Sequence, residues 1–307
     1  MKALVFNMLT IAATFAAMTA CTSESDPVDE VNPKDAKVEI KATAGIGVIN
    51  VETKAAIEQG KALTNVQFVR SDGDSPVWSD INNISGTGNI AAGSPGAITF
   101  TPAQYYPKNG KTSLIGYYPE GTITAGVVSF QIDGTKDILC SEVVEANRAD
   151  IDTKPKVSFT FKHKLTQLQF KVKAKDAEAI NIWGTITSIT LKDQKTTAKL
   201  DLSTQELKFD AGKTPITAAS GLSQVLTADQ EGIAIGNAIM VEPEQAKYTV
   251  TVITSKNSAG VDIDLAGVTG TASTAYTVLL TFKGKDIDAT GSIEAWTPDT
   301  NGTGETD

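Results

Sequence analysis

Histidine and cysteine are scarce in this sequence, which limits the chemistry that it can support. It contains one histidine, His163, and two cysteines, Cys21 and Cys140. One histidine without a Cys-x-x-Cys pair is too small a ligand set for a zinc site. A serine-type triad would have to use His163, and no Gly-x-Ser-x-Gly elbow is present. We therefore expect no metal, no cofactor and no catalytic residue, and we assign His163 a structural role.

A nucleophilic dyad of Cys140 and His163 is the remaining alternative for these residue types. Cys140 follows Ile138-Leu139 in a strand-like run, and a cysteine in such a run is usually a buried, inert thiol. No spacing singles out a pair of carboxylates for glycoside hydrolysis, because a sequence does not show which acids meet in space. A hydrolase thus stays open as a third reading of the chain.

Basic residues and long apolar runs are also few. The chain has 27 lysines and arginines against 36 aspartates and glutamates, a net charge of -9. An acidic chain lacks the positive surface that nucleic acids require, and it is not drawn to an anionic membrane surface. The apolar segment 3–17 is short and is interrupted by Asn7, Thr10 and Thr14, so it does not predict a membrane span.

The start of the chain has the order of a secretory signal. Lys2 gives a basic start, an apolar run follows, and Met18-Thr19-Ala20 precedes Cys21. We expect residues 1–20 to be a signal peptide and Cys21 to be lipidated, its thiol taking diacylglycerol and its amine a fatty acid such as palmitate. Leucine is usual where Met18 stands, so a plain signal peptide with an incidental Cys21 is the alternative. With Cys21 acylated, Cys140 has no disulfide partner.

Period-two alternation of apolar and polar residues dominates the rest of the chain. Residues 21–36 are acidic and broken by Pro27 and Pro33, which predicts a flexible tether. Beyond them, threonine, valine and isoleucine crowd the alternating runs, as in half-buried β-strands. The runs are 38–42, 66–68, 98–100, 128–132, 157–161, 168–172, 189–191, 200–202, 248–252 and 276–282. Helical patterns are limited to 54–62 and 175–182, so we predict an all-β fold of sandwiches or open barrels.

A domain boundary fits best near Thr153-Lys154-Pro155, a polar link with a proline between two groups of strands. The expected organisation is a signal peptide at 1–20, a tether at 21–36, an N-terminal β-sandwich at 37–154, a C-terminal β-sandwich at 155–298 and an acidic polar tail at 299–307.

Two short motifs have ordinary explanations. Asp72-Gly73-Asp74 resembles the opening of a calcium loop, but Pro76 and Val77 occupy the places of a ligand and the turn glycine, which favours a polar hairpin tip. Gly86-Thr87-Gly88 half-matches a dinucleotide fingerprint without the helix that must follow.

Tyr105-Tyr106-Pro107 recurs as Tyr117-Tyr118-Pro119. Successive strand residues point to opposite faces, so each pair is expected to offer one ring to the core and one to solvent, where rings can stack on sugars.

Several segments carry a family resemblance when they are taken in order. They are the acidic stretch behind Cys21, Val51-Glu52-Thr53-Lys54-Ala55, the two Tyr-Tyr-Pro runs, Asp137-Ile138-Leu139, Phe161-Lys162-His163-Lys164-Leu165 and Ile293-Glu294-Ala295-Trp296. Together these segments span nearly all of the chain behind Cys21. Their order resembles that of the fimbrillin family, which comprises the type V pilin subunits and related surface lipoproteins of Bacteroidales.

The resemblance implies two tandem transthyretin-like antiparallel β-sandwich domains and assembly by strand exchange. In the family, a lipidated precursor is cut after a basic residue, typically arginine in a Thr-Arg context, and a strand from another subunit replaces the first strand. Here Thr53-Lys54 stands in that context, which makes Lys54 the candidate processing site. The alternative is that Lys54 merely begins a short solvated helix. The donor would be the region Ile287 to Trp296 or another subunit's strand.

We therefore expect a fimbrial (pilus) subunit at the cell outer membrane, structural or accessory, that is not an enzyme. Its expected partners are other pilin subunits and the outer membrane, reached through the lipid anchor. The alternative is a monomeric surface lipoprotein that binds glycans or host ligands through sandwich loops.

Lipidation at Cys21 predicts that Cys21→Ser releases the protein from membranes or blocks its processing, because the acidic chain has no other strong attraction to lipid. Membrane fractionation with high-salt washing measures this. A serine variant that stays in the membrane fraction at the wild-type level contradicts the assignment.

Overall fold

The computed structural model describes residues 37–46, 60–79 and 84–293. Nearly all of its regular structure is β-strand, so the predicted all-β class is confirmed. The described residues include one α-helix, α1 (Ala177–Trp183), and a 3-10 turn, η3 (Arg148–Asp150). Helix α1 begins where the Asp176 carboxylate accepts a hydrogen bond from the Ala179 N–H at 2.9 Å, and it ends at Gly184, whose φ is 72°. Both are common ways to cap a helix.

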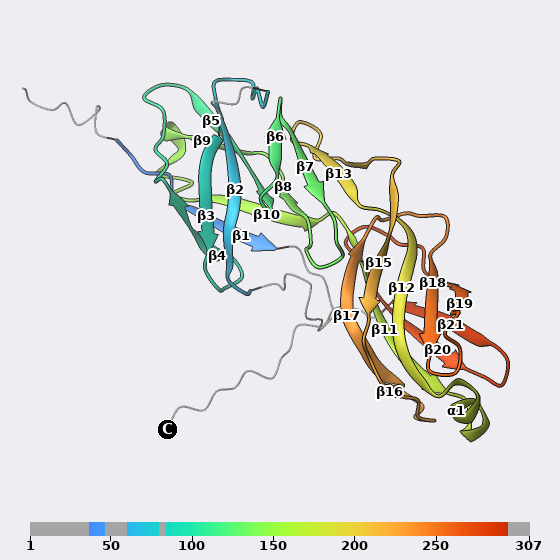
Figure 1. The fold of residues 1–307 in the computed structure, drawn as a ribbon. Helices are drawn as coiled ribbons and strands as arrows, with labels where there is room; N and C mark the ends of the chain where they lie inside the picture. The colour runs from blue at the N-terminus through green and yellow to red at the C-terminus, as the bar shows by residue number, and fades with distance from the viewer. Residues whose placement is uncertain (1–36, 47–59, 80–83, 294–307) are drawn as a thin grey trace, which may run out of the picture. The chain divides into compact units, whose positions relative to one another are not determined.

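The first group of strands closes into a ring. Its strands, in spatial order, are β2 (Leu63–Asp72), β3 (Ile84–Ile90), β4 (Gly96–Thr101), β1 (Ala42–Ile46), β10 (Val157–His163), β8 (Leu139–Ser141) and β5 (Lys111–Tyr118), with β9 (Val144–Asn147) bonded to β5. Because β2 also pairs with β5, the seven strands form a closed barrel (Figure 1). Closure leaves β1 with a hydrogen-bonded neighbour on each side.

Phenylalanine rings fill the barrel. The Phe68 ring lies edge-on to Phe100 and Phe159, with ring centroids 5.0 and 5.2 Å apart. Small residues make room for these rings: a Cβ added at Gly116 would lie 2.5 Å from Phe161 Cζ, and one added at Gly88 would lie 2.7 Å from Phe68 Cε2. The interior therefore has no spare volume at its centre.

The second group of strands forms two sheets around a shared core. One has the order β17 (Ile233–Val241), β11 (Thr166–Ala174), β20 (Ala275–Phe282) and β21 (Ile287–Ile293). The other has the order β15 (Lys213–Ala219), β12 (Thr185–Lys195), β18 (Thr249–Thr254) and β19 (Val261–Asp264), with β16 (Gln224–Val225) bonded to β12. Phe170 of β11 and Leu191 of β12 are fully buried in the same core, as expected for two packed sheets.

A further sheet contains strands from both sides of the predicted boundary. Its order is β14 (Leu207–Phe209), β13 (Thr197–Asp201), β7 (Val127–Gln131) and β6 (Thr122–Thr124). β7 and β13 pair antiparallel, and β10, which starts just after residue 155, belongs to the first barrel. Strand pairing thus crosses the region near residue 155, and the division into 37–154 and 155–298 stays a prediction.

The alternation of apolar and polar residues predicted where the strands lie, but it did not predict that the first group of strands closes into a barrel. Val157, Phe159 and Phe161 are buried as the alternation predicts. The same pattern fits a two-layer sandwich and a closed barrel, because both bury one face of each strand. The pair of transthyretin-like sandwiches is therefore not confirmed at this level of detail.

The crowding at the barrel centre gives a stability prediction. Gly116→Ala should lower the free energy of unfolding by about 1–3 kcal/mol, because the added methyl overlaps Phe161 and Phe68. Gly45→Ala is the matched control, since a Cβ there meets nothing within 4 Å. Chemical denaturation of the two variants measures the difference. Equal stabilities would show that the barrel interior is looser than described.

Candidate functional site: the N-terminal strand and its groove

The N-terminal strand β1 lies between two strands that come much later in the chain. It pairs parallel with β10, with Ala42 opposite Val157 and Ile46 opposite Phe161, and antiparallel with β4, with Ala42 opposite Ile98. In Figure 1, β1 is the blue arrow beside β10. A strand bonded along both edges closes the barrel, so its removal would open two unpaired edges at once.

The residues before β1 extend this pairing. The Ile40 N–H donates to the Gln104 carbonyl at 2.8 Å, and the Tyr106 N–H donates to the Val38 carbonyl at 2.9 Å. On the other edge, the Val157 N–H donates to the Lys41 carbonyl at 2.9 Å. The paired segment is therefore 38–46, and we call it the N-terminal strand segment.

The inward side chains of this segment follow a large–small–small–large order. Ile40, Ala42, Ala44 and Ile46 are all buried in the barrel core. Burial of an isoleucine contributes about 1.5–3 kcal/mol, and an alanine methyl contributes far less. Two isoleucines that contribute most of the burial energy thus flank two alanines that contribute little. An emptied groove would bare Phe159, Phe161 and Ile98 beside unsatisfied backbone groups, a surface that another strand can fill.

Comparison with known protein families matches residues 36–296 to the fimbrillin-like family. The chain belongs to the fimbrillin-like family. The resemblance expected from the sequence is confirmed by this match.

A curated relative in Bacteroides uniformis, named "Putative fimbrium subunit Fim1C", is 25% identical over 303 residues, covering 94% of each chain. Two solved structures have a similar fold. One, a "putative cell adhesion protein" from Bacteroides uniformis, has a TM-score of 0.60 and 20% identity, and the match covers 87% of this chain and 100% of that one. The other carries the same description and comes from Bacteroides ovatus, with a TM-score of 0.54, 17% identity and coverage of 86% and 99%.

The two residues predicted for modification, Cys21 and Lys54, lie outside the described residues, so lipidation and processing stay predictions. The helices in the described part of this fimbrillin-like chain are all too short to cross a bilayer.

The single histidine is buried at the end of β10 and pairs with an aspartate. His163 is 3% exposed and its Nδ1 contacts the Asp137 carboxylate, which is 2% exposed. The His163 carbonyl accepts a hydrogen bond from Ser273 Oγ at 2.6 Å, which ties β10 to the loop before β20. These contacts fit the structural role expected of His163. The Asp137 partner was not predicted, because it comes from a loop 26 residues away.

Cys140 and His163 do not form a dyad. On the paired strands β8 and β10, Cys140 is opposite Lys162, and His163 is opposite Leu139. Side chains alternate between faces along a strand, so the thiol and the imidazole point to opposite faces. Burial raises the pKa of the Cys140 thiol to about 11, which keeps it neutral at physiological pH. The expectation of a buried, inert thiol is met.

Only one of the four repeated tyrosines offers an exposed ring. Tyr105 is 39% exposed, with the Lys37 ammonium 5.8 Å from its ring centroid, whereas Tyr106 and Tyr117 are buried. Tyr118 is partly buried and packs against the barrel core, so the second pair offers no fully exposed ring. A single ring is a small platform for sugar binding, which weakens the glycan-binding alternative.

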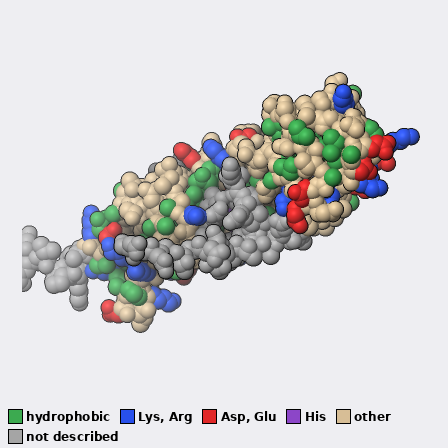
Figure 2. Space-filling view, turned by 90° about the horizontal axis from the view of Figure 1, so that it is seen from below, with side chains coloured by type: hydrophobic (Ala, Val, Ile, Leu, Met, Phe, Trp, Pro, Cys, Tyr) green, Lys and Arg blue, Asp and Glu red, His purple; other side chains and the backbone are tan. Residues whose placement is uncertain are grey.

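Asp72-Gly73-Asp74 fits its ordinary explanation, whereas Gly86-Thr87-Gly88 lies within strand β3 and is not the glycine-rich turn that its composition suggests. Asp72-Gly73-Asp74 ends β2 and starts a loop, with Gly73 at a φ of 118°. In the described part of the chain, no three histidine, cysteine, aspartate or glutamate side chains cluster as metal ligands would. On the face drawn in Figure 2, side chains of both charge signs are interspersed. Among the described residues, many charged side chains form ion pairs, such as Lys192 Nζ and Asp262 Oδ2 at 2.6 Å.

The buried pair gives a second stability prediction. His163→Ala should lower the free energy of unfolding by about 3–5 kcal/mol, because it leaves the Asp137 carboxylate buried without this partner. Lys162→Ala, on the same strand, should change it very little, since its ion pair with Glu142 is exposed. Denaturant titration of both variants tests this. A loss of some purified activity in His163→Ala, at unchanged stability, would instead reopen the enzymatic reading.

Proposed function

We propose that this fimbrillin-like chain is a subunit of a cell-surface fimbrium, structural or accessory, which assembles by exchange of its N-terminal strand segment. It is exported as a lipoprotein and held first at the outer membrane through Cys21. The observation that carries the proposal is a match between the strand that fills the barrel groove and the last strand of the same chain.

The match is one of sequence and spacing. Residues 40–46 read Ile-Lys-Ala-Thr-Ala-Gly-Ile, and residues 287–293 read Ile-Asp-Ala-Thr-Gly-Ser-Ile. Both have isoleucine, alanine, a residue no larger than alanine, and isoleucine at alternate positions. Ile287 and Ala289 are buried in their own sheet, as Ile40 and Ala42 are in the barrel. The last strand, β21, thus carries the side-chain order that the groove accommodates.

The pairing of β21 supports its role as the donor strand. Among the residues that the structure describes, it is the end strand of its sheet and forms a ladder with β20 alone. On its outer edge, the Gly291 N–H donates one hydrogen bond to the Ala266 carbonyl. A strand in the barrel groove forms two ladders. When β21 of a second copy enters a vacated groove, it exchanges one ladder for two, at about 0.5–1.5 kcal/mol per hydrogen bond.

Release of the resident strand needs a break in the chain behind it. A cut after Lys54, in Thr53-Lys54, separates the segment from Cys21 to Lys54, which includes β1, from the barrel. The freed segment can leave without unfolding the rest of the fold. The partners in the fibre are other pilin subunits, copies of this chain or different ones.

The finer fold assignment belongs to the same proposal. We assign the two packed sheets of β11–β21 to the second transthyretin-like sandwich of the family and the closed barrel to its counterpart in the first half. The names of the relatives, a fimbrium subunit and cell adhesion proteins, agree with a surface role.

The experiment is strand displacement on folded protein. Lipid-free protein is cut with trypsin and mixed with an excess of a peptide of residues 286–296. We expect the peptide to displace the N-terminal fragment, because it matches the groove, and size-exclusion chromatography with mass spectrometry detects the release. SDS-resistant ladders should form when the cut protein is concentrated without peptide.

The matched control is the same peptide with Ala289→Leu, whose larger side chain would meet the crowded centre of the barrel. It should displace the fragment at least tenfold more slowly. The proposal is wrong if the wild-type peptide displaces nothing, or if the leucine peptide works equally well.

A further inference from the structure

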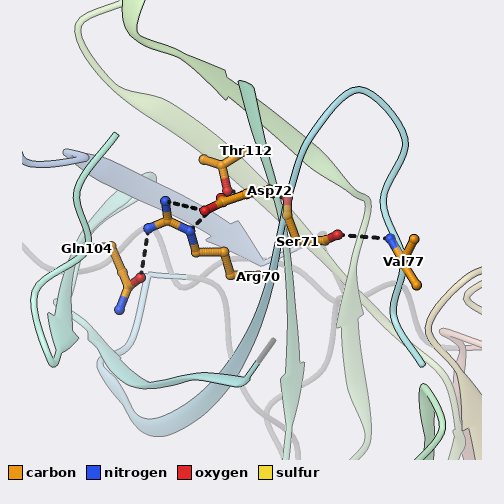
Figure 3. Close-up of polar contacts among 6 residues, drawn as sticks. All are labelled: Arg70, Ser71, Asp72, Val77, Gln104 and Thr112. Atoms are coloured by element: carbon orange, nitrogen blue, oxygen red, sulfur yellow. Dashed lines mark hydrogen bonds and ion pairs between the residues drawn. The ribbon is translucent and has the colours of Figure 1, made fainter. Parts of the chain in front are cut away.

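Arg70 of β2 makes a polar bridge at one end of the barrel (Figure 3). Its Nε and Nη2 donate to the two carboxylate oxygens of Asp72, at 2.8 and 3.2 Å, and its Nη1 donates to Gln104 Oε1 at 3.2 Å. Hydrogen bonds from a guanidinium to a carboxylate in this two-point geometry are strong and directional. The Arg70 side chain is 19% exposed and Gln104 is 7% exposed, whereas the Asp72 side chain is 53% exposed. The contact between Arg70 and Gln104 is therefore shielded from water, while the ion pair with Asp72 lies at the surface.

The Asp72 carboxylate is held in its ionised form by its neighbours. Burial raises the pKa of its carboxyl, but hydrogen bonds from Arg70 and Thr112 and the charge of Arg70 outweigh burial, so that the pKa is lowered. Asp72 therefore stays ionised and holds the guanidinium in one orientation, aimed at Gln104.

Gln104 belongs to segment 102–106, which lies between β4 and β5 and pairs with the residues before β1. Its side-chain amide donates to the Pro102 carbonyl at 2.9 Å, which fixes the turn of the segment. Its backbone carbonyl accepts the Ile40 N–H, and two residues later the Tyr106 N–H donates to the Val38 carbonyl. Glu39 and Tyr105 form a β-bridge between these two bonds. Segment 102–106 is thus the pairing partner of residues 38–40.

The start of this segment is fixed by packing and its middle by Arg70. A Cβ added at Gly86 would lie 2.4 Å from the Thr101 carbonyl oxygen and 2.9 Å from Pro102 Cδ, so β3 and the end of β4 are in close contact. Beyond Pro102 the chain no longer pairs with β3, and the Gln104 side chain contacts Arg70 of β2 while its backbone pairs with Ile40. Loss of the contact with Arg70 would loosen the segment and, with it, the backbone bonds to Ile40 and Val38.

We propose that Arg70, through Gln104, is a positioning residue that latches residues 38–40 to the barrel and so sets how fast the N-terminal strand segment is released. This inference rests on the proposed strand exchange and adds its control point. A cut after Lys54 frees the far end of the strand segment, beyond Ile46. The latch lies at the opposite end, and the cut strand stays in place until the latch opens.

Hydrogen exchange on the full, uncut, lipid-free chain tests the latch. The Ile40 and Tyr106 amides report on it directly, because they are the donors of its two backbone bonds. Arg70→Gln should speed their exchange about tenfold or more, since local opening no longer has to break a charge-assisted contact. Gln104→Ala, which keeps the backbone, should have the same effect and guards against a folding defect in the arginine variant.

Arg148→Gln, a change at the second arginine of the sequence, is the control and should leave both amides at the wild-type rate. Amides of the β11–β20 ladder should not change in any variant. After trypsin cutting, the peptide of residues 286–296 should displace the strand about tenfold faster from Arg70→Gln than from wild type.

Unchanged exchange of Ile40 and Tyr106 in both latch variants would overturn the inference. An equal acceleration over β2, β5 and β10 would overturn it too, since Arg70 would then support the barrel as a whole. If the two amides respond as expected but no peptide ever displaces the strand, the latch stands and the proposed exchange fails.

Discussion

The two-sided pairing of residues 38–46 is the interaction on which the rest of the barrel depends. These residues connect β4 to β10, two strands that have no direct ladder with each other. Without them the ring has an opening one strand wide, with backbone groups exposed on both sides. Exposed strand edges of this kind recruit other strands, either usefully or as aggregates. In the proposed strand exchange, the feature that completes the subunit is also the one through which it polymerises.

Packing inside the barrel decides which strand can occupy the opening. Phe68, Phe159 and Phe161 fill the centre of the barrel. They fit there because Gly88 and Gly116 have no side chain, and a Cβ at either position would overlap a phenylalanine ring. The occupying strand contributes alanines at its two middle positions and isoleucines at its ends. In the proposed exchange, affinity would come from the ladders and the two end residues, and the small middle positions would select the incoming strand. Such a division is typical of strand addition, in which main-chain hydrogen bonds give affinity and side-chain packing gives specificity.

Local pattern predicted much of the fold and little of the long-range pairing. The alternation of 157–161 and 276–282 identified β10 and β20, because period two is a property of each strand alone. Which distant strands pair could not be predicted, because the pairing of distant strands depends on the whole core. This applies to the parallel pairing of β1 with β10, to the pairing of β2 with β5 and to that of β7 with β13. For the same reason, the contacts of Asp137 with His163 and of Arg70 with Gln104 were not predicted, because each joins residues that are distant in the sequence. The match between 40–46 and 287–293 is in the sequence itself, but it became meaningful only when the structure placed the first segment inside a groove.

The most direct test of strand exchange asks which chain lies beside β10 in an assembled fibre. Ser158 is exposed on β10 and faces Thr43 of β1 in the register of this structure. A photo-crosslinker placed at position 158 should link to the peptide that contains Thr43 in the uncut subunit. In fibres, the account predicts a link to the peptide that contains Thr290 of a neighbouring chain, the residue equivalent to Thr43 in the matched segment. A link to Thr43 of the same chain in fully assembled fibres would contradict it.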